Sequence, residues 1–222
     1  MEGQIGELID ATMSLQPKPS GCALTLSQRG LINDVVSRYG AFDNVLALFA
    51  PKYQQQYVAD VERCYFGHAP SLTALRLAYG DTAPVEWLSY QIIDLNRFSG
   101  CRPMTDHQVK ELASIISKDY YYLKLTELMD FFSRVKSCEY GKLFYGSVDP
   151  MEVIIALRRY ADDRAEIIRR KEEADDRAER DREREVRRAN ALKPAEIQAL
   201  RERLQAKWAE EDKQKQTKEP QT

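Results

Sequence analysis

The chain has 222 residues, with 33 Lys or Arg against 35 Asp or Glu, so its formal net charge is −2. This balance argues against a protein that binds nucleic acid or an anionic membrane mainly by charge, because such proteins carry an excess of Lys and Arg. No apolar run approaches the roughly 18 residues that a membrane-spanning helix needs. The first residues, MEGQIGELIDATM, are acidic where a secretory signal is basic. We therefore expect a cytoplasmic protein with no membrane segment.

The sequence has four cysteines, which are Cys22, Cys64, Cys101 and Cys138. They lie far apart, and no two of them form a C-x-x-C pair. Neither a disulfide framework nor a zinc knuckle is indicated, so we expect reduced thiols. His68 and His107 would join a metal site only if the fold brought them beside Cys64 and Cys101. The sequence predicts no cofactor and no metal.

Apolar residues at helical spacing predict a succession of helices. The first five expected helices run from Ser27 to Gly40, Phe42 to Phe49, Pro51 to Gly67, Ser71 to Gly80, and Pro84 to Gly100. A further helix follows Thr105, which can form a capping box with Gln108, and another follows Thr126 as its cap. Only residues 142–148 look strand-like, and a lone short strand cannot build a sheet.

An aromatic turn over residues 139–150 precedes a long charged helix. Gly141 and Gly146 are expected to have positive φ or close packing. Asp149 can cap the helix and Pro150 suits its first position, since the missing N–H of proline had no partner there. In residues 158–191, 23 of 34 positions are charged, a composition typical of coiled-coil helices.

Four acid-before-base pairs at i,i+4 support this charged helix by roughly 0.2 to 0.5 kcal/mol each. They are Glu166–Arg170, Glu173–Arg177, Asp176–Arg180 and Glu183–Arg187. Pro194 interrupts the helix, and Ile197, Leu200, Leu204 and Trp208 then form the apolar side of a short amphipathic helix. These apolar side chains need something to pack on, so Leu200, Leu204 and Trp208 are the predicted partner-binding residues.

The predicted fold is all-α, with a compact multi-helix domain followed by a long charged helix and a second, short amphipathic helix. The expected organisation is a flexible segment over residues 1–25, a globular domain over 26–165 and a charged, solvent-exposed helix over 166–192. An amphipathic helix over 193–212 and a disordered tail over 213–222 complete the chain.

Direct nucleic-acid binding is the alternative function. Aromatic rings can stack on bases while nearby Lys and Arg hold phosphates, and residues 120–159 contain both kinds of side chain. The candidate residues are Tyr122, Arg134, Lys136, Tyr140, Lys142, Phe144, Tyr145, Arg158 and Arg159. The competing explanation is that these rings fill the core where the last helices of the domain meet.

The helices after Asp106 and Glu127 also have the spacing of a helix-turn-helix, with residues 143–148 as a wing. We expect Glu127 and Asp130 on the outer face of the second helix, where acids would repel phosphate. No nucleotide-binding or catalytic motif is present, and the paired acids Asp162–Asp163 and Asp175–Asp176 lie in charge-rich sequence. We therefore predict no enzymatic activity.

Residues 85–165 resemble an uncharacterised family of small helical bacterial proteins that are often found in phage-like and conjugative elements. The resemblance rests on Leu95-Asn96-Arg97-Phe98, on Phe131-Phe132 and above all on the Phe-Tyr-Gly-x-Val-Asp-Pro segment that ends at Pro150. It implies no activity and no functional residues. The layout is loosely similar to helicase-loading proteins of phage replication, and such an analogy does not license function.

The expected function is therefore a non-enzymatic interaction or adaptor module in the replication or maintenance of a mobile element. It would bind a protein partner, or a second copy, through its carboxyl-terminal helices.

Overall fold

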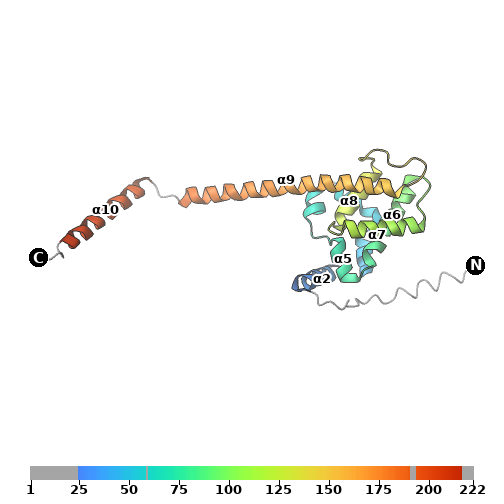
Figure 1. Cartoon of the computed structure of the whole chain (residues 1–222), viewed down its shortest axis with the longest axis horizontal. Helices are drawn as coiled ribbons and strands as arrows, with labels where there is room; N and C mark the ends of the chain where they lie inside the picture. Colours follow the sequence, from blue (N-terminus) through green and yellow to red (C-terminus); the bar gives the residue numbers. More distant parts are fainter. Residues whose placement is uncertain (1–24, 59, 191–193, 217–222) are drawn as a thin grey trace, which may run out of the picture. The chain divides into compact units, whose positions relative to one another are not determined.

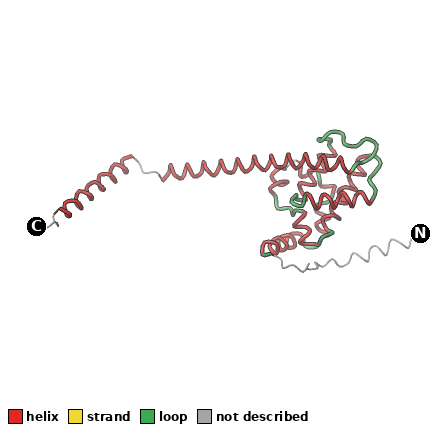
Figure 2. The backbone as a smooth tube through the Cα atoms, viewed as in Figure 1, coloured by secondary structure: helices red, strands yellow, loops and turns green. Residues whose placement is uncertain are grey.

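The computed structural model describes residues 25–58, 60–190 and 194–216, and Figure 2 shows helices and loops throughout these ranges. The all-α prediction is confirmed, since the described part of the chain contains no strand. The predicted flexible segment lies almost wholly outside the described residues, as do residues 191–193 and 217–222. No helix among the described residues has the length and apolar character needed to cross a bilayer.

The chain divides into two compact units, of which the first ends at Glu166 and the second begins at Ile167. The first unit holds α2 (Leu26–Tyr39), α3 (Phe42–Leu48), α5 (Leu72–Tyr79), α6 (Ala83–Ser99), α7 (Asp106–Asp119) and α8 (Leu125–Lys136), labelled in part in Figure 1. The first turns of α9 (Pro150–Asn190) complete it. The second unit holds the remainder of α9 and α10 (Pro194–Gln216), which continues beyond the expected end at residue 212.

Side-chain caps begin several helices as the sequence predicts. Thr105 and Gln108 form the predicted capping box of α7, with the Gln108 N–H donating to Thr105 Oγ1 over 3.3 Å. Ser71 Oγ accepts the Ala74 N–H at the start of α5. Asp149 Oδ1 accepts the Met151 N–H over 2.8 Å at the start of α9, so the predicted Asp149–Pro150 helix start is confirmed. Each cap satisfies an N–H that has no partner within its helix.

The prediction of one helix from Pro51 to Gly67 is wrong. The segment contains a 3₁₀ turn (Pro51–Tyr53), the short α4 (Gln55–Val58) and a π-helix, η3 (Glu62–Phe66). Asp60 accepts the Arg63 N–H through Oδ1 over 2.9 Å, a local bond that competes with regular helix pairing. The break lets Tyr57, Cys64 and Tyr65 all reach the core.

The prediction that Thr126 caps α8 is also wrong, because the helix already begins at Leu125. The Thr126 side chain is buried, and its hydroxyl donates to the Cys64 carbonyl over 2.7 Å instead. The Glu127 carboxylate takes the capping role and accepts the Lys124 N–H over 2.8 Å. A buried hydroxyl needs a partner, and the neighbouring π-helix supplies it.

Helix α6 is the central helix of the first unit and contacts α5, α7 and α8. Its Trp87 is buried, and the indole Nε1–H donates to the Phe49 carbonyl over 3.1 Å. The buried Gln91 amide donates to the same carbonyl over 2.9 Å and accepts a hydrogen bond from Gln54 over 2.7 Å. Polar side chains thus satisfy the orphan carbonyl at the end of α3, beside the apolar core.

The aromatic turn before α9 has the predicted backbone, since φ is +83° at Gly141 and +89° at Gly146. The strand-like stretch makes only a single isolated bridge, between Arg102 and Ser147, and it forms no wing. Beyond the turn, α9 buries Val153, Ala156, Leu157 and Tyr160. The start of this helix is therefore part of the core of the first unit.

Replacing Gly146 by Ala should destabilise the protein by about 1 kcal/mol or more, because an L side chain is strained at positive φ even where space is open. Gly30 is the matched control, since it lies inside α2 and a Cβ added there would meet no heavy atom within 4 Å. Gly30→Ala should stabilise by roughly 0.5 to 1 kcal/mol through helix propensity. Urea unfolding of both variants checks the opposite signs, and equal effects would contradict this explanation.

Truncation after Arg170 should leave a domain that unfolds cooperatively, because the fully buried residues of α9 all precede Glu166. Thermal melting followed by circular dichroism at 222 nm tests this on the shortened chain. A truncated chain that loses its cooperative transition would show that the charged part of α9 belongs to the folding unit.

Candidate protein-interaction site

The predicted partner-binding residues lie along one side of α10. Leu200, Leu204 and Trp208 are exposed by 49%, 41% and 61%, and Ile197 continues the row toward the helix start. Spacings of three and four residues keep these side chains within a narrow arc, because successive residues of an α-helix are about 100° apart. Alanines such as Ala199 occupy the opposite side, so the apolar row, defined by Ile197, Leu200, Leu204 and Trp208, is narrow.

Exposed ion pairs support the charged part of α9. The predicted Glu183–Arg187 pair is present, with 3.1 Å between the carboxylate and guanidinium. Glu173 pairs with Arg169 over 2.5 Å, and Asp175 pairs with Lys171 over 3.7 Å, so base-before-acid pairs occur as well. Arg180 donates to the backbone carbonyl of Asp176 rather than to its carboxylate. Each exposed pair contributes little, and together they allow a helix with few apolar residues.

Two cationic side chains of the candidate nucleic-acid segment, Arg134 and Lys136, form ion pairs with acidic side chains of the same chain. Arg134 donates from Nε to Asp130 over 2.9 Å and from Nη1 to Glu139 over 2.8 Å. Lys136 forms an ion pair with Asp94 and also donates to Gln54 Oε1 over 2.7 Å. Both side chains are only 17% exposed. Their charge is therefore neutralised inside the protein.

The other nucleic-acid candidates do not gather into one surface. Lys142 and Phe144 line a hollow together with Cys101 and Cys138, whereas Tyr140 and Arg159 line another together with Asp162 and Asp163. Arg158 lines a third hollow, between α7 and α9.

Two rings of the segment pair with cations of the same chain. Tyr122 lies under the Arg164 guanidinium, 5.2 Å from its ring centroid, and the exposed Tyr145 has the Lys142 ammonium 5.0 Å from its centroid. Tyr122 also contacts Tyr121 edge to face and Tyr120 at a tilt, with 5.8 and 6.5 Å between ring centroids, so these rings are not in a parallel stack.

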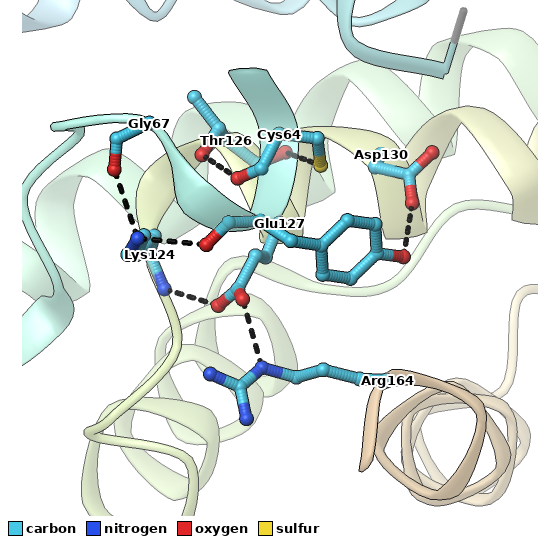
Figure 3. Close-up of polar contacts among 8 residues, drawn as sticks. Cys64, Gly67, Lys124, Thr126, Glu127, Asp130 and Arg164 are labelled. Carbon is cyan, nitrogen blue, oxygen red and sulfur yellow. Dashed lines mark hydrogen bonds and ion pairs between the residues drawn. The ribbon is translucent and has the colours of Figure 1, made fainter. Parts of the chain in front are cut away.

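A buried acidic cluster corrects the expectation that Glu127 and Asp130 lie on the outer face of α8. Both carboxylates are buried, and Figure 3 shows the Arg164 side chain reaching Glu127. Glu127 accepts from Arg164 Nε over 2.8 Å, in addition to the Lys124 N–H. α8 is covered on this side by η3 and by the first turns of α9, so the acids face other helices instead of solvent.

Asp130 completes the cluster on the next turn of α8. Its Oδ2 accepts from the Tyr65 hydroxyl and from Arg134 Nε, each over 2.9 Å. The Tyr65 ring stacks on Tyr160 of α9 with 6.4 Å between ring centroids. Two arginines thus neutralise two buried carboxylates. The Arg134–Asp130 pair lies within α8, whereas the Arg164–Glu127 pair and the Tyr65–Asp130 hydrogen bond join segments that are far apart in the sequence.

Burial controls the protonation of the groups in this cluster. It raises the pKa of the Glu127 carboxyl, although the Lys124 N–H and Arg164 favour the charged form. Burial also raises the pKa of the Cys64 thiol and of the Tyr65 and Tyr160 hydroxyls. A thiol held protonated is a poor nucleophile, and the neutral Tyr65 phenol donates to Asp130, so the cluster is suited to holding helices together.

Lys124 ties the π-helix to α8. Its ammonium donates to the carbonyls of Tyr65 and Gly67 over 2.7 and 2.8 Å, as Figure 3 shows. Within the described ranges, no three His, Cys, Asp or Glu side chains are grouped to hold a metal ion. Sequence reasoning missed the cluster, because Glu127, Asp130 and Arg134 fall at i, i+3 and i+7 on one polar side of α8, which is the pattern of a solvent-exposed face.

The described residues form an all-helical protein. Buried ion pairs and hydrogen bonds join the helices of its core, and an apolar row is exposed on its last helix. Residues 103–214 match the model of a family of unknown function, DUF6633, and the chain belongs to this family. The matched range begins before α7 and ends within α10, so it contains Glu127, Arg164 and the apolar row. No curated protein and no solved structure matches the chain.

Replacing Arg164 by Met should destabilise the protein by about 2 to 4 kcal/mol, because the buried Glu127 carboxylate loses its cationic partner. Arg159→Met is the control, since Arg159 is exposed on the same helix and should change stability by no more than about 0.5 kcal/mol. Urea unfolding measures both values. Equal stabilities of the two variants would show that the ion pair does not hold α9 to α8.

Proposed function

We propose that this protein is a non-enzymatic interaction module that captures a protein partner through the apolar row of α10. The observation that carries the proposal is the exposure of Leu200, Leu204 and Trp208 together on one side of a helix. Amphipathic helices with apolar anchors at such spacing bind in hydrophobic grooves of other proteins. Tryptophan supplies a large share of binding energy where it enters such a groove.

Helix stability supports the same proposal. Apart from the narrow row and the alanines on the opposite side, the 23 residues of α10 are mostly polar or charged. In proteins most of the stability of a helix comes from the packing of one of its faces. A partner that covers the row would therefore stabilise the helix and remove three large side chains from water at the same time.

The setting is also part of the proposal. The family match is consistent with the resemblance to an uncharacterised family, and we propose that the protein acts in the replication or maintenance of a mobile genetic element. The Phe-Tyr-Gly-x-Val-Asp-Pro turn supports this setting only through that resemblance. Its residues hold the start of α9 in place, through the Asp149 cap and the buried Val148.

Direct nucleic-acid binding receives less support. Arg134 and Lys136 are paired with Asp130, Glu139 and Asp94, so phosphate would have to displace carboxylates that are already in contact. Five of the seven remaining candidates line three different hollows, one of which also carries Asp162 and Asp163. Acids at that position would repel a phosphate backbone.

The double variant Leu204→Asp, Trp208→Ala should lose partner capture and keep the thermal stability of the first unit. Tagged full-length protein, expressed in its own host and recovered with its bound proteins, tests this by mass spectrometry. At least one protein should be recovered with the wild type and be depleted about tenfold or more with the variant, in line with the loss of two anchor residues.

The matched control is Ala199→Asp, which adds the same charge on the opposite side of α10. It should retain the captured protein. If both variants recover the same proteins as the wild type, the row does not bind a partner. A shift of labelled single-stranded DNA by the wild type, weakened by Lys142→Glu, would support the nucleic-acid alternative instead.

A further inference from the structure

Two of the cysteines, Cys101 and Cys138, line the same small hollow in the first unit. The hollow has a volume of about 280 Å³, and its wall also includes Leu95 of α6 and Val135 of α8. Cys138 is exposed and Cys101 is partly buried, and both are free thiols. The fold thus brings to one place two thiols that are 37 residues apart in the sequence.

Both thiols lie in this hollow because α6 and α8 end side by side. The two helices are in contact, and Lys136, the last residue of α8, forms an ion pair with Asp94 of α6. The Lys136 ammonium also lies 5.6 Å from the ring centroid of Phe98, one residue before the end of α6. Each cysteine comes two residues after the end of its helix. The cysteines therefore follow the carboxyl ends of two neighbouring helices.

Backbone hydrogen bonds join the segments that carry the two cysteines. The Arg102 N–H donates to the Gly146 carbonyl, and the Val148 N–H donates to the Arg102 carbonyl, each over 2.9 Å. Arg102 directly follows Cys101, and the aromatic turn over residues 139–150 directly follows Cys138. These bonds therefore hold the Cys101 segment against the turn that Cys138 begins.

The position of the two cysteines outside the helices permits a bond between them. A disulfide requires Cα atoms roughly 4.4 to 6.8 Å apart, with Cβ atoms directed toward each other. Both cysteines lie in turns or bends, which adjust more readily than helices because no helical hydrogen bonds have to break. The sulfur atoms can therefore approach each other while α6 and α8 stay in place.

The backbone at Cys138 gives an independent reason to single out this residue. Among the described residues other than glycine, only Cys138 has a positive φ, at +59°. Residues with a side chain avoid this region, and the position after a helix cap is usually glycine or asparagine. Strain at a residue with a reactive side chain points to a use for that side chain.

We propose that Cys101 and Cys138 form a reversible disulfide when the protein meets hydrogen peroxide. The thiolate of the more exposed Cys138 attacks one peroxide oxygen, so that an S–O bond forms, the O–O bond breaks and the leaving hydroxide takes up a proton to become water. The thiolate of Cys101 then attacks the sulfur of this sulfenic acid. The S–S bond forms, the S–O bond breaks and a second water leaves. Two thiols thus lose two electrons to one molecule of peroxide.

The disulfide closes a loop that contains α7 and α8, and it fixes the start of the aromatic turn to the end of α6. Such a link restricts the unfolded chain, which favours the folded state. The proposal does not depend on the function proposed for α10, because no residue is shared between the two sites.

Cys64 is the internal comparison. Its thiol is buried in η3, its Sγ–H donates to the Thr126 carbonyl over 3.6 Å, and burial raises its pKa. Peroxide reacts with accessible thiolates, so Cys64 should stay reduced while Cys101 and Cys138 are oxidised.

Mass spectrometry of the full-length protein, reduced and then treated with hydrogen peroxide under native conditions, tests the proposal. The remaining thiols are alkylated after denaturation, and the wild type should carry two alkyl groups on its four cysteines. Digestion should yield a peptide pair linked through Cys101 and Cys138, and dithiothreitol should restore all four reactive thiols. Cys64→Ser is the matched control and should form the same link, as should Cys22→Ser.

A second variant separates the disulfide from simple oxidation of an exposed thiol. In Cys101→Ser the reaction should stop at the Cys138 sulfenic acid, which dimedone traps as a stable adduct. The wild type should give at least about tenfold less of this adduct, because the Cys101 thiol consumes the sulfenic acid first. Circular dichroism of each variant before treatment confirms that the fold is kept.

Three results would overturn the proposal. The wild type would keep four reactive thiols after treatment, or its linked peptides would contain Cys22 or join two chains. In the third case the Cys138 adduct would form equally in the wild type and in Cys101→Ser. Failure of the α10 variant to lose partner capture would leave this proposal standing, since the disulfide is measured on the isolated protein.

Discussion

The pairing of two buried carboxylates with two arginines is the constraint on which the first unit depends. Glu127 and Asp130 lie inside the protein, where an unpaired charge costs several kcal/mol. Arg164 of α9 and Arg134 of α8 remove that cost through charge-assisted hydrogen bonds of 2.8 and 2.9 Å. Because Arg164 is 37 residues beyond Glu127, the pair forms only when α9 has packed on α8. The ion pair therefore selects one position of α9 along its neighbour.

The same cluster explains how one continuous helix serves two environments. The early turns of α9 supply Val153, Leu157 and Tyr160 to the core and Arg164 to the acid, whereas its later turns consist mostly of ion-paired surface residues. Apolar burial stabilises the first part and helix-internal charge pairs stabilise the second. The change falls close to the division between the two units, after Glu166.

The cluster also bears on function, because it uses side chains that otherwise suggest contact with phosphate. Arg134 and Tyr65 contact the Asp130 carboxylate, and the Tyr65 ring stacks on Tyr160. The cationic and aromatic groups of these residues therefore make contacts inside the core. The exposed apolar side chains include the row of α10 and those that line the groove between α7 and α9. Both are apolar surfaces with charged edges, which suits binding to protein better than binding to a polyanion.

Local chemistry in the sequence determined the helix starts at Thr105 and Asp149 and the positive φ of Gly141 and Gly146. It also determined the all-α class and the row on α10. In each case the signal, a cap, a glycine or helical spacing, acts over a few residues. Only the tertiary structure decided that Glu127 and Asp130 are buried, that residues 51–67 break into three short elements, and that α7 and α9 form a groove. The burial of Glu127 needs Arg164, and the packing of the π-helix on α8 needs contacts such as the hydrogen bond from Thr126 to the Cys64 carbonyl, and in both cases the partner lies dozens of residues away. A charged residue on a helix is by default solvated, and the burial of Glu127 requires a guanidinium that only the folded chain brings to it.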